Sequence, residues 1–221
     1  MNISRRQAGG WLAGVLLLGS AGAHADVYVD FFRAVNVDNV RGVRAALERG
    51  LDPNVLDERG QCALYLAIRE DNPQVFELLL NWPGVKPDLA NAVGETPLMM
   101  AALKGQLDRM QQLLDRGAAP HKSDWSPLHY AATGPSAAAV RLLLDKGAPI
   151  DARSANGSTP LMMAARYGDE QSVILLIERG ADLAARNGLD MDAFAFARGA
   201  DRDWMVRTLE QQQRRRAAVP R

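Results

Sequence analysis

Cysteine and histidine are scarce in this sequence of 221 residues, which contains one cysteine and three histidines. The single thiol, Cys62, rules out an intramolecular disulfide framework and a cysteine-rich zinc site. Three histidines leave little material for a histidine-based metal site. An excess of positive charge is also absent, because 26 Lys and Arg residues balance 26 Asp and Glu residues. This balance argues against a strongly basic nucleic-acid-binding protein.

Catalytic motifs and long apolar runs are absent too. The sequence contains no glycine-rich phosphate loop, no H-E-x-x-H zinc motif, no nucleophile elbow and no carboxylate pair. We therefore expect neither an enzyme nor a bound cofactor or metal. The apolar stretch from Trp11 to Leu18 is too short for a transmembrane helix, which needs about 20 residues. Hydrophobic residues at 48% and charged residues at 24% indicate a globular chain.

Residues 1–25 have the features of a signal peptide. Arg5 and Arg6 give a positive start, the apolar stretch follows, and Ala23-His24-Ala25 forms an A-x-A cleavage pattern before Asp26. We therefore expect export to the periplasm, with a mature chain that begins at Asp26 and carries no membrane segment. The Arg pair resembles the start of a twin-arginine signal, and the ordinary Sec route fits this segment equally well.

Four segments of the remaining chain repeat one pattern. Residues 94–102 read GETPLMMAA and residues 157–165 read GSTPLMMAA, while SPLHYAA at 126–132 and GQCALYLA at 60–67 are more degenerate copies. The shared leucine falls at positions 64, 98, 128 and 161, so the copies follow one another at a nearly constant spacing. A second leucine-rich block follows each copy. Self-similarity at such a period indicates a stack of repeated units.

This pattern resembles that of ankyrin repeats, whose hallmark is T-P-L-H-x-A at a period of about 33 residues. The resemblance implies an all-α repeat solenoid, a stack of about six helix-turn-helix units with short β-hairpin or loop fingers. The two terminal units are expected to be caps. The expected divisions are a signal peptide at 1–25, an ankyrin-repeat domain at 26–210 and a basic tail at 211–221. Within the domain we expect a cap repeat at 26–59, internal repeats at 60–93, 94–123, 124–156 and 157–187, and a cap repeat at 188–210.

The third unit shows why each unit forms two helices. Thr96 is suited to the N-cap position of a first helix, and Pro97 follows at N1, where its missing N–H costs nothing. Met110 and Leu113 share one face of a second helix, which Gly117 ends as a C′ glycine. Isolated helices shorter than about 12–15 residues are marginal in water, so each unit needs its neighbours to bury its apolar stripe.

Several side chains admit both a chemical and a structural role. His129 could be a general base, but no Ser, Cys or Asp partner is arranged around it, and the family uses this position structurally. Cys62 could be a redox-sensitive thiol, but we prefer a small buried residue. The methionine pairs at 99–100 and 162–163 are interpreted as core filler rather than copper ligands. Arginines 214–216 could touch anionic lipid or an acidic partner, but we prefer a solvated, frayed helix end.

The ankyrin resemblance implies that the protein binds another protein with its loop tips and the inner surface of its first helices. The candidate residues flank the motif: Glu58, Arg59, Arg69, Glu70, Glu95, Leu103, Lys104, Trp125, Arg166 and Tyr167. Trp125 is the strongest candidate, because aromatic residues dominate interface hot spots and packing does not demand an indole here. The alternative is that Trp125 only folds over a short loop.

One finger departs from the pattern. The segment that joins Gly117 to Pro127 is shorter than the corresponding segment from Gly147 to Pro160. The finger between the third and fourth units is therefore three residues short and is expected to leave a notch beside Trp125. A partner-specific feature and neutral drift are both compatible with this difference.

The expected function follows from the resemblance. Exported bacterial relatives are linked to peroxide defence alongside catalase and to neutralisation of toxins. We expect a monomeric periplasmic adaptor or chaperone-like factor in envelope or oxidative-stress defence. The alternatives are an immunity protein that binds and neutralises a toxin, and a structural envelope scaffold. The sequence does not name the protein partner.

Overall fold

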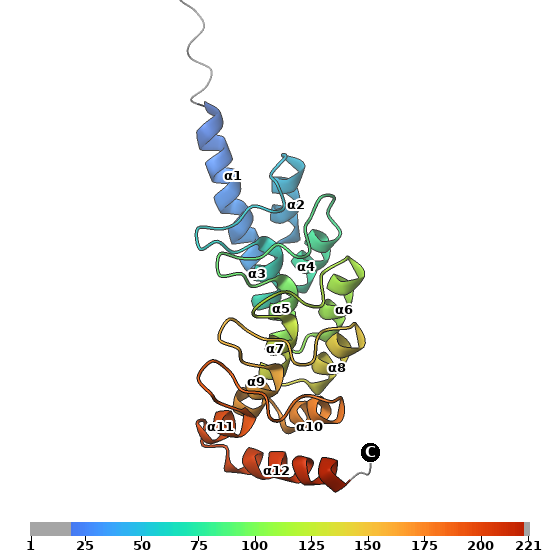
Figure 1. Cartoon of the computed structure of the whole chain (residues 1–221). Coiled ribbons are helices and arrows are strands. Elements are labelled where there is room, and N and C mark those ends of the chain that lie inside the picture. Colours follow the sequence, from blue (N-terminus) through green and yellow to red (C-terminus); the bar gives the residue numbers. More distant parts are fainter. Residues whose placement is uncertain (1–18, 219–221) are drawn as a thin grey trace, which may run out of the picture.

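The computed structural model describes residues 19–218, with side chains from Asp26 onward. This part forms twelve α-helices and no strand, which confirms the predicted all-α repeat solenoid (Figure 1). Its fingers are loops, and the isolated β-bridge between Leu56 and Cys62 lies in the first of them. The helices are α1 (Gly19–Asn36), α2 (Val40–Glu48), α3 (Ala63–Arg69), α4 (Pro73–Leu80), α5 (Pro97–Leu103), α6 (Leu107–Asp115), α7 (Pro127–Thr133), α8 (Ala137–Asp145), α9 (Pro160–Tyr167), α10 (Glu170–Glu178), α11 (Ala193–Arg198) and α12 (Asp203–Ala218).

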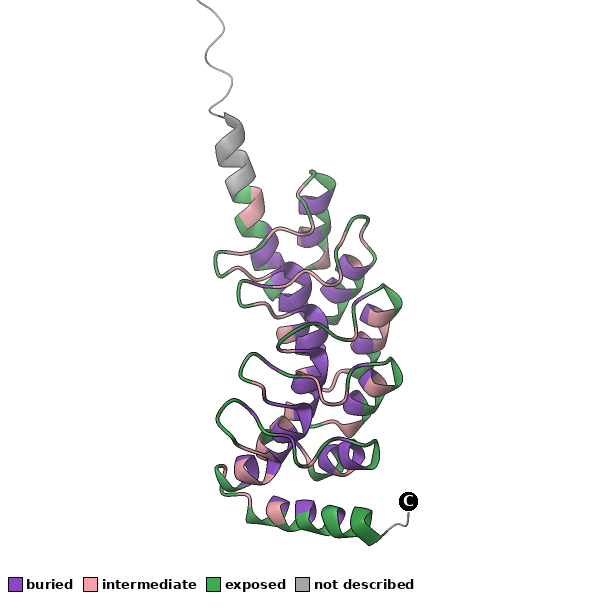
Figure 2. Ribbon diagram, viewed as in Figure 1, coloured by how far each residue is buried: buried purple, intermediate pink, exposed green. Residues whose placement is uncertain are grey.

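The helix pairs stack into two columns (Figure 1). In the inner column α3, α5, α7, α9 and α11 each pack on the next, and α1 packs on α2 and α3 at the amino-terminal end. The outer column consists of α2, α4, α6, α8 and α10. Helix α12 lies across the carboxy-terminal end, against α10 and α11. Figure 2 shows that buried residues follow the inner column, whereas exposed residues cover the finger tips and the outer edge.

Local signals begin and end the helices where the sequence predicts. The Thr96 hydroxyl accepts a hydrogen bond from the Met99 N–H at 3.3 Å, and Pro97 opens α5. Thr159 caps α9 in the same way. Beyond α6, Gly117 has a φ of 90°, which a residue with a Cβ rarely adopts. The predicted N-cap, N1 and C′ positions are confirmed.

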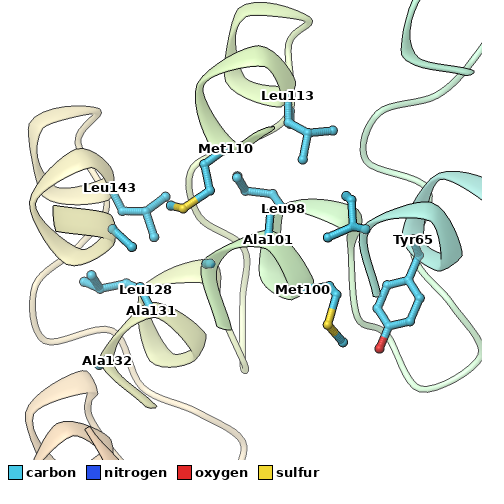
Figure 3. Close-up of a cluster of buried hydrophobic side chains, with 14 of the residues drawn as sticks. Tyr65, Leu98, Met100, Ala101, Met110, Leu113, Leu128, Ala131, Ala132 and Leu143 are labelled. Atoms are coloured by element: carbon cyan, nitrogen blue, oxygen red, sulfur yellow. The ribbon is translucent and has the colours of Figure 1, made fainter. Parts of the chain in front are cut away.

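The core lies between the two columns. Leu98 and Leu128 from the inner helices and Met110, Leu113 and Leu143 from the outer helices have no solvent-exposed surface and belong to one cluster (Figure 3). Full burial of such a side chain stabilises the fold by about 1.5–3 kcal/mol. The cluster runs through every unit, so each interface between repeats contributes to one continuous core.

The methionines at the third position of α5 and α9 are buried, as predicted for core residues. Met99 and Met162 are buried, and their sulfur atoms accept hydrogen bonds from the Thr96 and Thr159 N–H groups at 3.3 and 3.4 Å. They occupy the position that His129 fills in α7. The sulfur atoms thus complete the helix caps from inside the core.

Neighbouring inner helices meet backbone to backbone at their carboxyl ends. A Cβ on Gly168, after α9, would lie 2.2 Å from the Ala132 carbonyl oxygen of α7. A Cβ on Gly134, after α7, would lie 2.5 Å from the Leu103 carbonyl oxygen of α5. Real Cβ atoms do not approach a carbonyl oxygen so closely, so these two glycines set the spacing of the inner column.

Longer helices close both ends of the stack. Helix α1 runs through the predicted cleavage point and buries Phe31 and Val35, while the Arg pair and the apolar stretch of the predicted signal lie outside the described residues. Helix α12 continues past residue 210 to Ala218. The Arg216 guanidinium donates a hydrogen bond to the Ala181 carbonyl oxygen at 2.7 Å. The last turns of α12 are therefore helical and attached to the repeat before it, rather than frayed.

Candidate binding surface

Five fingers join each outer helix to the next inner helix. We name them by their residues: finger A is 49–62, finger B is 81–96, finger C is 116–126, finger D is 146–159 and finger E is 179–192. By these bounds finger C is the shortest, and it lacks three of the positions that fingers A, D and E each contain. In Figure 1 the loop before α7 reaches less far from the inner column than the loops before α5 and α9. The structure therefore contains the shortened finger that the sequence predicts.

The longer fingers share a turn that finger C lacks. In finger B the Asn91 N–H donates to the Glu95 carbonyl oxygen at 2.8 Å, and in finger D the Ser154 N–H donates to the Ser158 carbonyl oxygen at 3.0 Å. Fingers A and E close in the same way. No backbone hydrogen bond closes an equivalent turn within the described residues of finger C. The missing three residues are thus the turn itself.

The tips of neighbouring fingers are tied together, and finger C uses a side chain for this. The Ala92 N–H of finger B donates to the Gly60 carbonyl oxygen of finger A, and the Gly188 N–H of finger E donates to the Asn156 carbonyl oxygen of finger D, both at 2.9 Å. In finger C the Lys122 ammonium donates to the Gly94 carbonyl oxygen at 2.8 Å. A long cation thus replaces the backbone contact that a full-length tip makes.

A hollow of about 210 Å³ lies between finger B and finger C. Its lining comes from the first arm of each finger and from the starts of α5 and α7: Asp88, Ala90, Thr96, Ala119, His121, Lys122 and Pro127. The Ala119 N–H donates to Asp88 Oδ2 at 2.8 Å and so joins the two fingers at the hollow. Burial raises the pKa of the Asp88 carboxyl, and this hydrogen bond offsets only part of that effect.

Trp125 stands at the end of finger C and is half-buried. Its ring lies edge-on to the ring of His129 in the next turn of chain, with 5.4 Å between the centroids and 69° between the planes. The indole therefore packs over the base of its own finger and keeps part of its surface exposed. A role for Trp125 in binding stays a prediction.

Glu95 joins three repeats rather than pointing away from the protein. Its carboxylate accepts hydrogen bonds from the Tyr65 hydroxyl at 2.7 Å, the Tyr130 hydroxyl at 2.8 Å and the Asn91 amide at 2.9 Å. Burial alone would raise the pKa of Glu95, but these three donors outweigh burial and lower it. Burial and then the bond to Glu95 raise the pKa of both tyrosines well above the ordinary range.

The candidate residues at the ends of α3 and α5 form a second group. The Arg69 guanidinium pairs with the Glu70 carboxylate at 2.6 Å, and the Lys104 ammonium donates to the Arg69 carbonyl oxygen at 2.7 Å. Leu103 is half-buried beside them. Positive side chains at the carboxyl ends of helices are favoured by the helix dipole, and the bond from Lys104 also joins the third unit to the second.

Arg166 and Tyr167 end α9 as a pair. The Arg166 guanidinium donates to the Tyr167 hydroxyl at 2.8 Å and lies 5.2 Å from the centre of the tyrosine ring. Tyr167 keeps 55% of its surface exposed. Glu58 and Arg59 are exposed at the tip of finger A. The predicted residues therefore extend along the inner column and the fingers from α3 to α9, and do not form one cluster.

Tyr65 and Tyr130 were not predicted from the sequence. Both occur inside the motif, at positions where other units carry Met99, His129 or Met100. A polar aromatic residue at such a position was the available signal. Their partner, Glu95, lies 30 residues from one and 35 residues from the other, so local pattern does not join them.

His129 and Cys62 carry the two reactive side chains that the sequence singled out, and both are buried. One ring nitrogen of His129 lies 2.9 Å from the Ser126 hydroxyl and the other lies 3.0 Å from the Ser158 carbonyl oxygen. Burial lowers the pKa of His129 and raises that of Cys62. The predicted burial of Cys62 and the predicted structural role of His129 are confirmed. Contrary to expectation, a serine hydroxyl does lie beside His129, but both side chains are buried and complete the start of α7.

Two further features of the described chain bear on its chemistry. No group of three or more His, Cys, Asp or Glu side chains in it has the arrangement of a metal site. None of its helices combines the length and apolar character that crossing a bilayer requires.

Comparison with known proteins identifies the repeats. A family model of ankyrin repeats, which spans three copies of the repeat, matches residues 31–124 and residues 107–187. The chain belongs to the ankyrin-repeat family. Members of this family are protein-binding modules and typically not catalysts, so the repeats are assigned a protein-binding role. The chain is 34% identical over 152 residues to the mouse B-cell lymphoma 3 protein homolog. The aligned residues make up 66% of this chain but only 34% of that relative, so the chain spans about a third of the relative's length.

Two bacterial structures share the fold of the ankyrin chain. One is a chain from the complex of a predatory endopeptidase of Bdellovibrio bacteriovorus with an immunity protein, at 24% identity and a TM-score of 0.69. The match covers 82% of this chain and 97% of that chain. The other is an ankyrin repeat domain from Acinetobacter baumannii, at 21% identity and a TM-score of 0.68, which covers 83% of this chain and 97% of that one.

Proposed function

We propose that this ankyrin-repeat protein is an immunity protein, which binds a toxic enzyme and blocks its activity. The supporting observation is the match to the Bdellovibrio complex, in which an ankyrin immunity protein is bound to an endopeptidase. The match extends over 97% of that chain, so the similarity covers nearly the whole of that chain rather than a single repeat. This observation favours the immunity role over the adaptor role in stress defence.

The surface of the described residues is compatible with an inhibitor that covers the active site of an enzyme. An ankyrin stack presents a rigid face, because each repeat is held by its neighbours. Arg166 and Tyr167 at the end of α9 and Trp125 at the end of finger C have partly exposed guanidinium or aromatic groups, the kinds of side chain that dominate interface hot spots. A rigid face that places such groups against an active site excludes substrate without any chemistry of its own.

A co-expression experiment tests this proposal. Genes next to the one for this chain are expressed singly in the periplasm of a test strain, with and without this protein. We expect one of them to encode a hydrolytic enzyme that kills or lyses the cells alone and is harmless with this protein. The two purified proteins should form a stoichiometric complex in which the enzyme is inactive.

The same experiment discriminates the alternatives. A neighbouring catalase, together with peroxide sensitivity after deletion of this gene, would support the adaptor in oxidative-stress defence instead. Survival in every co-expression pair, with no complex formed, would contradict an immunity role.

Export to the periplasm belongs to the same proposal. Cleavage before Asp26 would leave the buried residues of α1, among them Phe31 and Val35, in the mature protein. N-terminal sequencing of the protein from a periplasmic fraction should therefore begin at Asp26. Replacement of Arg5 and Arg6 by Lys should block export only if the twin-arginine route is used. Soluble cytoplasmic protein that retains Met1 would contradict export.

A further inference from the structure

The hollow between finger B and finger C combines apolar walls with a carboxylate. Ala90, Ala119 and Pro127 supply the walls, and Asp88 lies among them, half-buried. Asp88 Oδ2 accepts the Ala119 N–H. Within residues 26–218 no Lys, Arg or His nitrogen lies close enough to Asp88 to form an ion pair. The hollow thus holds a negative charge that the protein itself does not neutralise.

The backbone contact of Asp88 is a repeated feature, whereas its surroundings are not. Asn54 Oδ1 accepts the Lys86 N–H at 2.8 Å, and Asp151 Oδ1 accepts the Asp182 N–H at 3.0 Å, each from the following finger. Asp88 is the member of this series whose following finger is the short finger C. The carboxylate therefore has the same structural bond as its counterparts but lies beside a finger that lacks its tip.

Neither basic side chain that lines the hollow pairs with Asp88. Lys122 lines it, but its ammonium group donates to the Gly94 carbonyl oxygen at 2.8 Å. His121 also lines it and is exposed to solvent. Neither side chain forms an ion pair with Asp88. A cation from outside the chain can therefore reach the carboxylate without breaking an existing pair.

We propose that this hollow receives an arginine or lysine side chain from a loop that the partner protein projects against finger C. The aliphatic stem would pack on the alanine and proline walls while the charged head pairs with Asp88. A volume of about 210 Å³ is below the range of about 300–1,000 Å³ that is typical of small-molecule sites, and it favours one side chain. The proposal rests on the proposed function only in requiring a protein partner.

The charge of the whole stack favours the same occupant. Residues 26–210 contain 20 basic and 26 acidic residues, which gives a net charge of 20 − 26 = −6. Such a stack attracts basic surfaces over long range and raises their rate of association. The short finger supplies the access, because a tip three residues longer would stand where the partner's loop has to enter.

Four variants of the full chain isolate the parts of this proposal. Asp88→Asn removes the charge and keeps an acceptor for the Ala119 N–H, and Asp151→Asn makes the same change at the matched position beside a full-length finger. Lys122→Gln removes the positive charge that lines the hollow. Insertion of Ser-Ala-Asn after Ser123, which copies residues 154–156, restores the normal finger length.

The probe is a library of random loops displayed on a small folded domain. The library is selected on the wild-type protein and counter-selected on the insertion variant. We expect the retained loops to carry Arg or Lys. Their affinity should fall by about tenfold or more in Asp88→Asn, the loss of one charged hydrogen-bonded pair, and stay within about twofold in Asp151→Asn. Lys122→Gln should leave the affinity unchanged or increase it.

Several outcomes would overturn the proposal. These are selection of no loops, selection of loops that bind Asp88→Asn as tightly as wild type, or selection of acidic loops that lose affinity in Lys122→Gln. Thermal melts establish that each variant is folded. If Asp88→Asn melts early, the affinity of the wild type between low and high salt is measured instead, and an unchanged affinity contradicts a charged pair. Because no toxin is used, this result stands or falls separately from the immunity proposal.

Discussion

The third residue of the inner helices and the tips of the fingers differ in what constrains them. Tyr65, Met99 and Met162 have different chemistry, yet none exposes more than 3% of its surface. At the finger tips, Val93 and Leu189 are apolar and still expose 79% and 74%. A side chain between helices must fit the space that its neighbours leave. A side chain at a tip touches little of its own protein, so its identity is free to follow a partner.

This contrast assigns stability and recognition to different layers of the molecule. The helix columns contain the continuous core, and the fingers contain the turn that varies in length. Substitutions in the helix columns should therefore change the free energy of unfolding, and substitutions in the fingers should change the affinity for a partner protein. Glu95 and Trp125 lie where the layers meet, so they test how sharp the division is.

The largest effect on stability is expected in the core. Leu113→Ala removes a fully buried side chain between α6 and its neighbours, and should lower the free energy of unfolding by about 2–5 kcal/mol. Denaturant melts measure this loss. Leu143→Ala at the matching position of α8 should behave alike, and a loss below about 1 kcal/mol for both would contradict the continuous core.

Trp125→Ala should mainly affect binding. A partly buried aromatic anchor commonly contributes about 2 kcal/mol or more, so affinity for the partner should fall about thirtyfold. Loss of the edge-on contact with His129 should cost the fold only about 0.5–1.5 kcal/mol beyond the lost burial. Calorimetric titration and a melt of the same sample separate the two effects. An unchanged affinity would move the binding surface to the outer face or to α12.

Glu95→Gln should affect stability through charge and in a pH-dependent way. The variant loses the charged acceptor of two tyrosine hydroxyls, which should cost roughly 1–3 kcal/mol near pH 7. Because the folded pKa of Glu95 lies below its usual value of 4.5, its contribution is present above that value and is lost as pH falls through the folded pKa.

Melts of wild type and Glu95→Gln at pH 7 and at about pH 3 measure this dependence. The difference between the two proteins should shrink at the lower pH. A difference that stays constant would show that the tyrosine bonds do not depend on the carboxylate charge.

The smallest effect is expected on the outer face. Glu178 is exposed at the end of α10, and Glu178→Ala should change the free energy of unfolding by no more than about 0.5 kcal/mol. The same denaturant melts serve as the reference for the core variants. A loss equal to that of Leu113→Ala would erase the distinction between core and surface.

Most of the fold could be predicted from the sequence, because its determinants are local and repeated. Thr96, Pro97 and Gly117 specify helix ends within a few residues of themselves. The recurrence of the same signals from one unit to the next then requires stacking, since no single unit buries its stripe. The short finger C could also be predicted, because the spacing of residues along the chain shows a difference in length without any knowledge of contacts.

The site was predictable only as a set of positions. The sequence placed Glu95 and Trp125 at corresponding points of two fingers, and both were expected to face a partner. The structure shows which contacts these side chains make within the protein, the Glu95 carboxylate with Tyr65 and Tyr130 and the Trp125 ring with His129, and their binding roles stay predictions. The direction of each side chain depends on what the adjacent repeat offers, and a repeat pattern does not encode that choice.

The sequence by itself determined the number of repeats, the ends of their helices, the buried leucines and the missing turn of finger C. These follow from hydrogen bonds and apolar spacing within one unit. Only the tertiary structure decided that Asp88 lies in a hollow where no side chain of the described residues forms an ion pair with it, that Lys122 reaches the Gly94 carbonyl oxygen, and that one carboxylate joins three repeats. Such contacts connect residues about one repeat apart, and their geometry is fixed when stacking sets the distance between units.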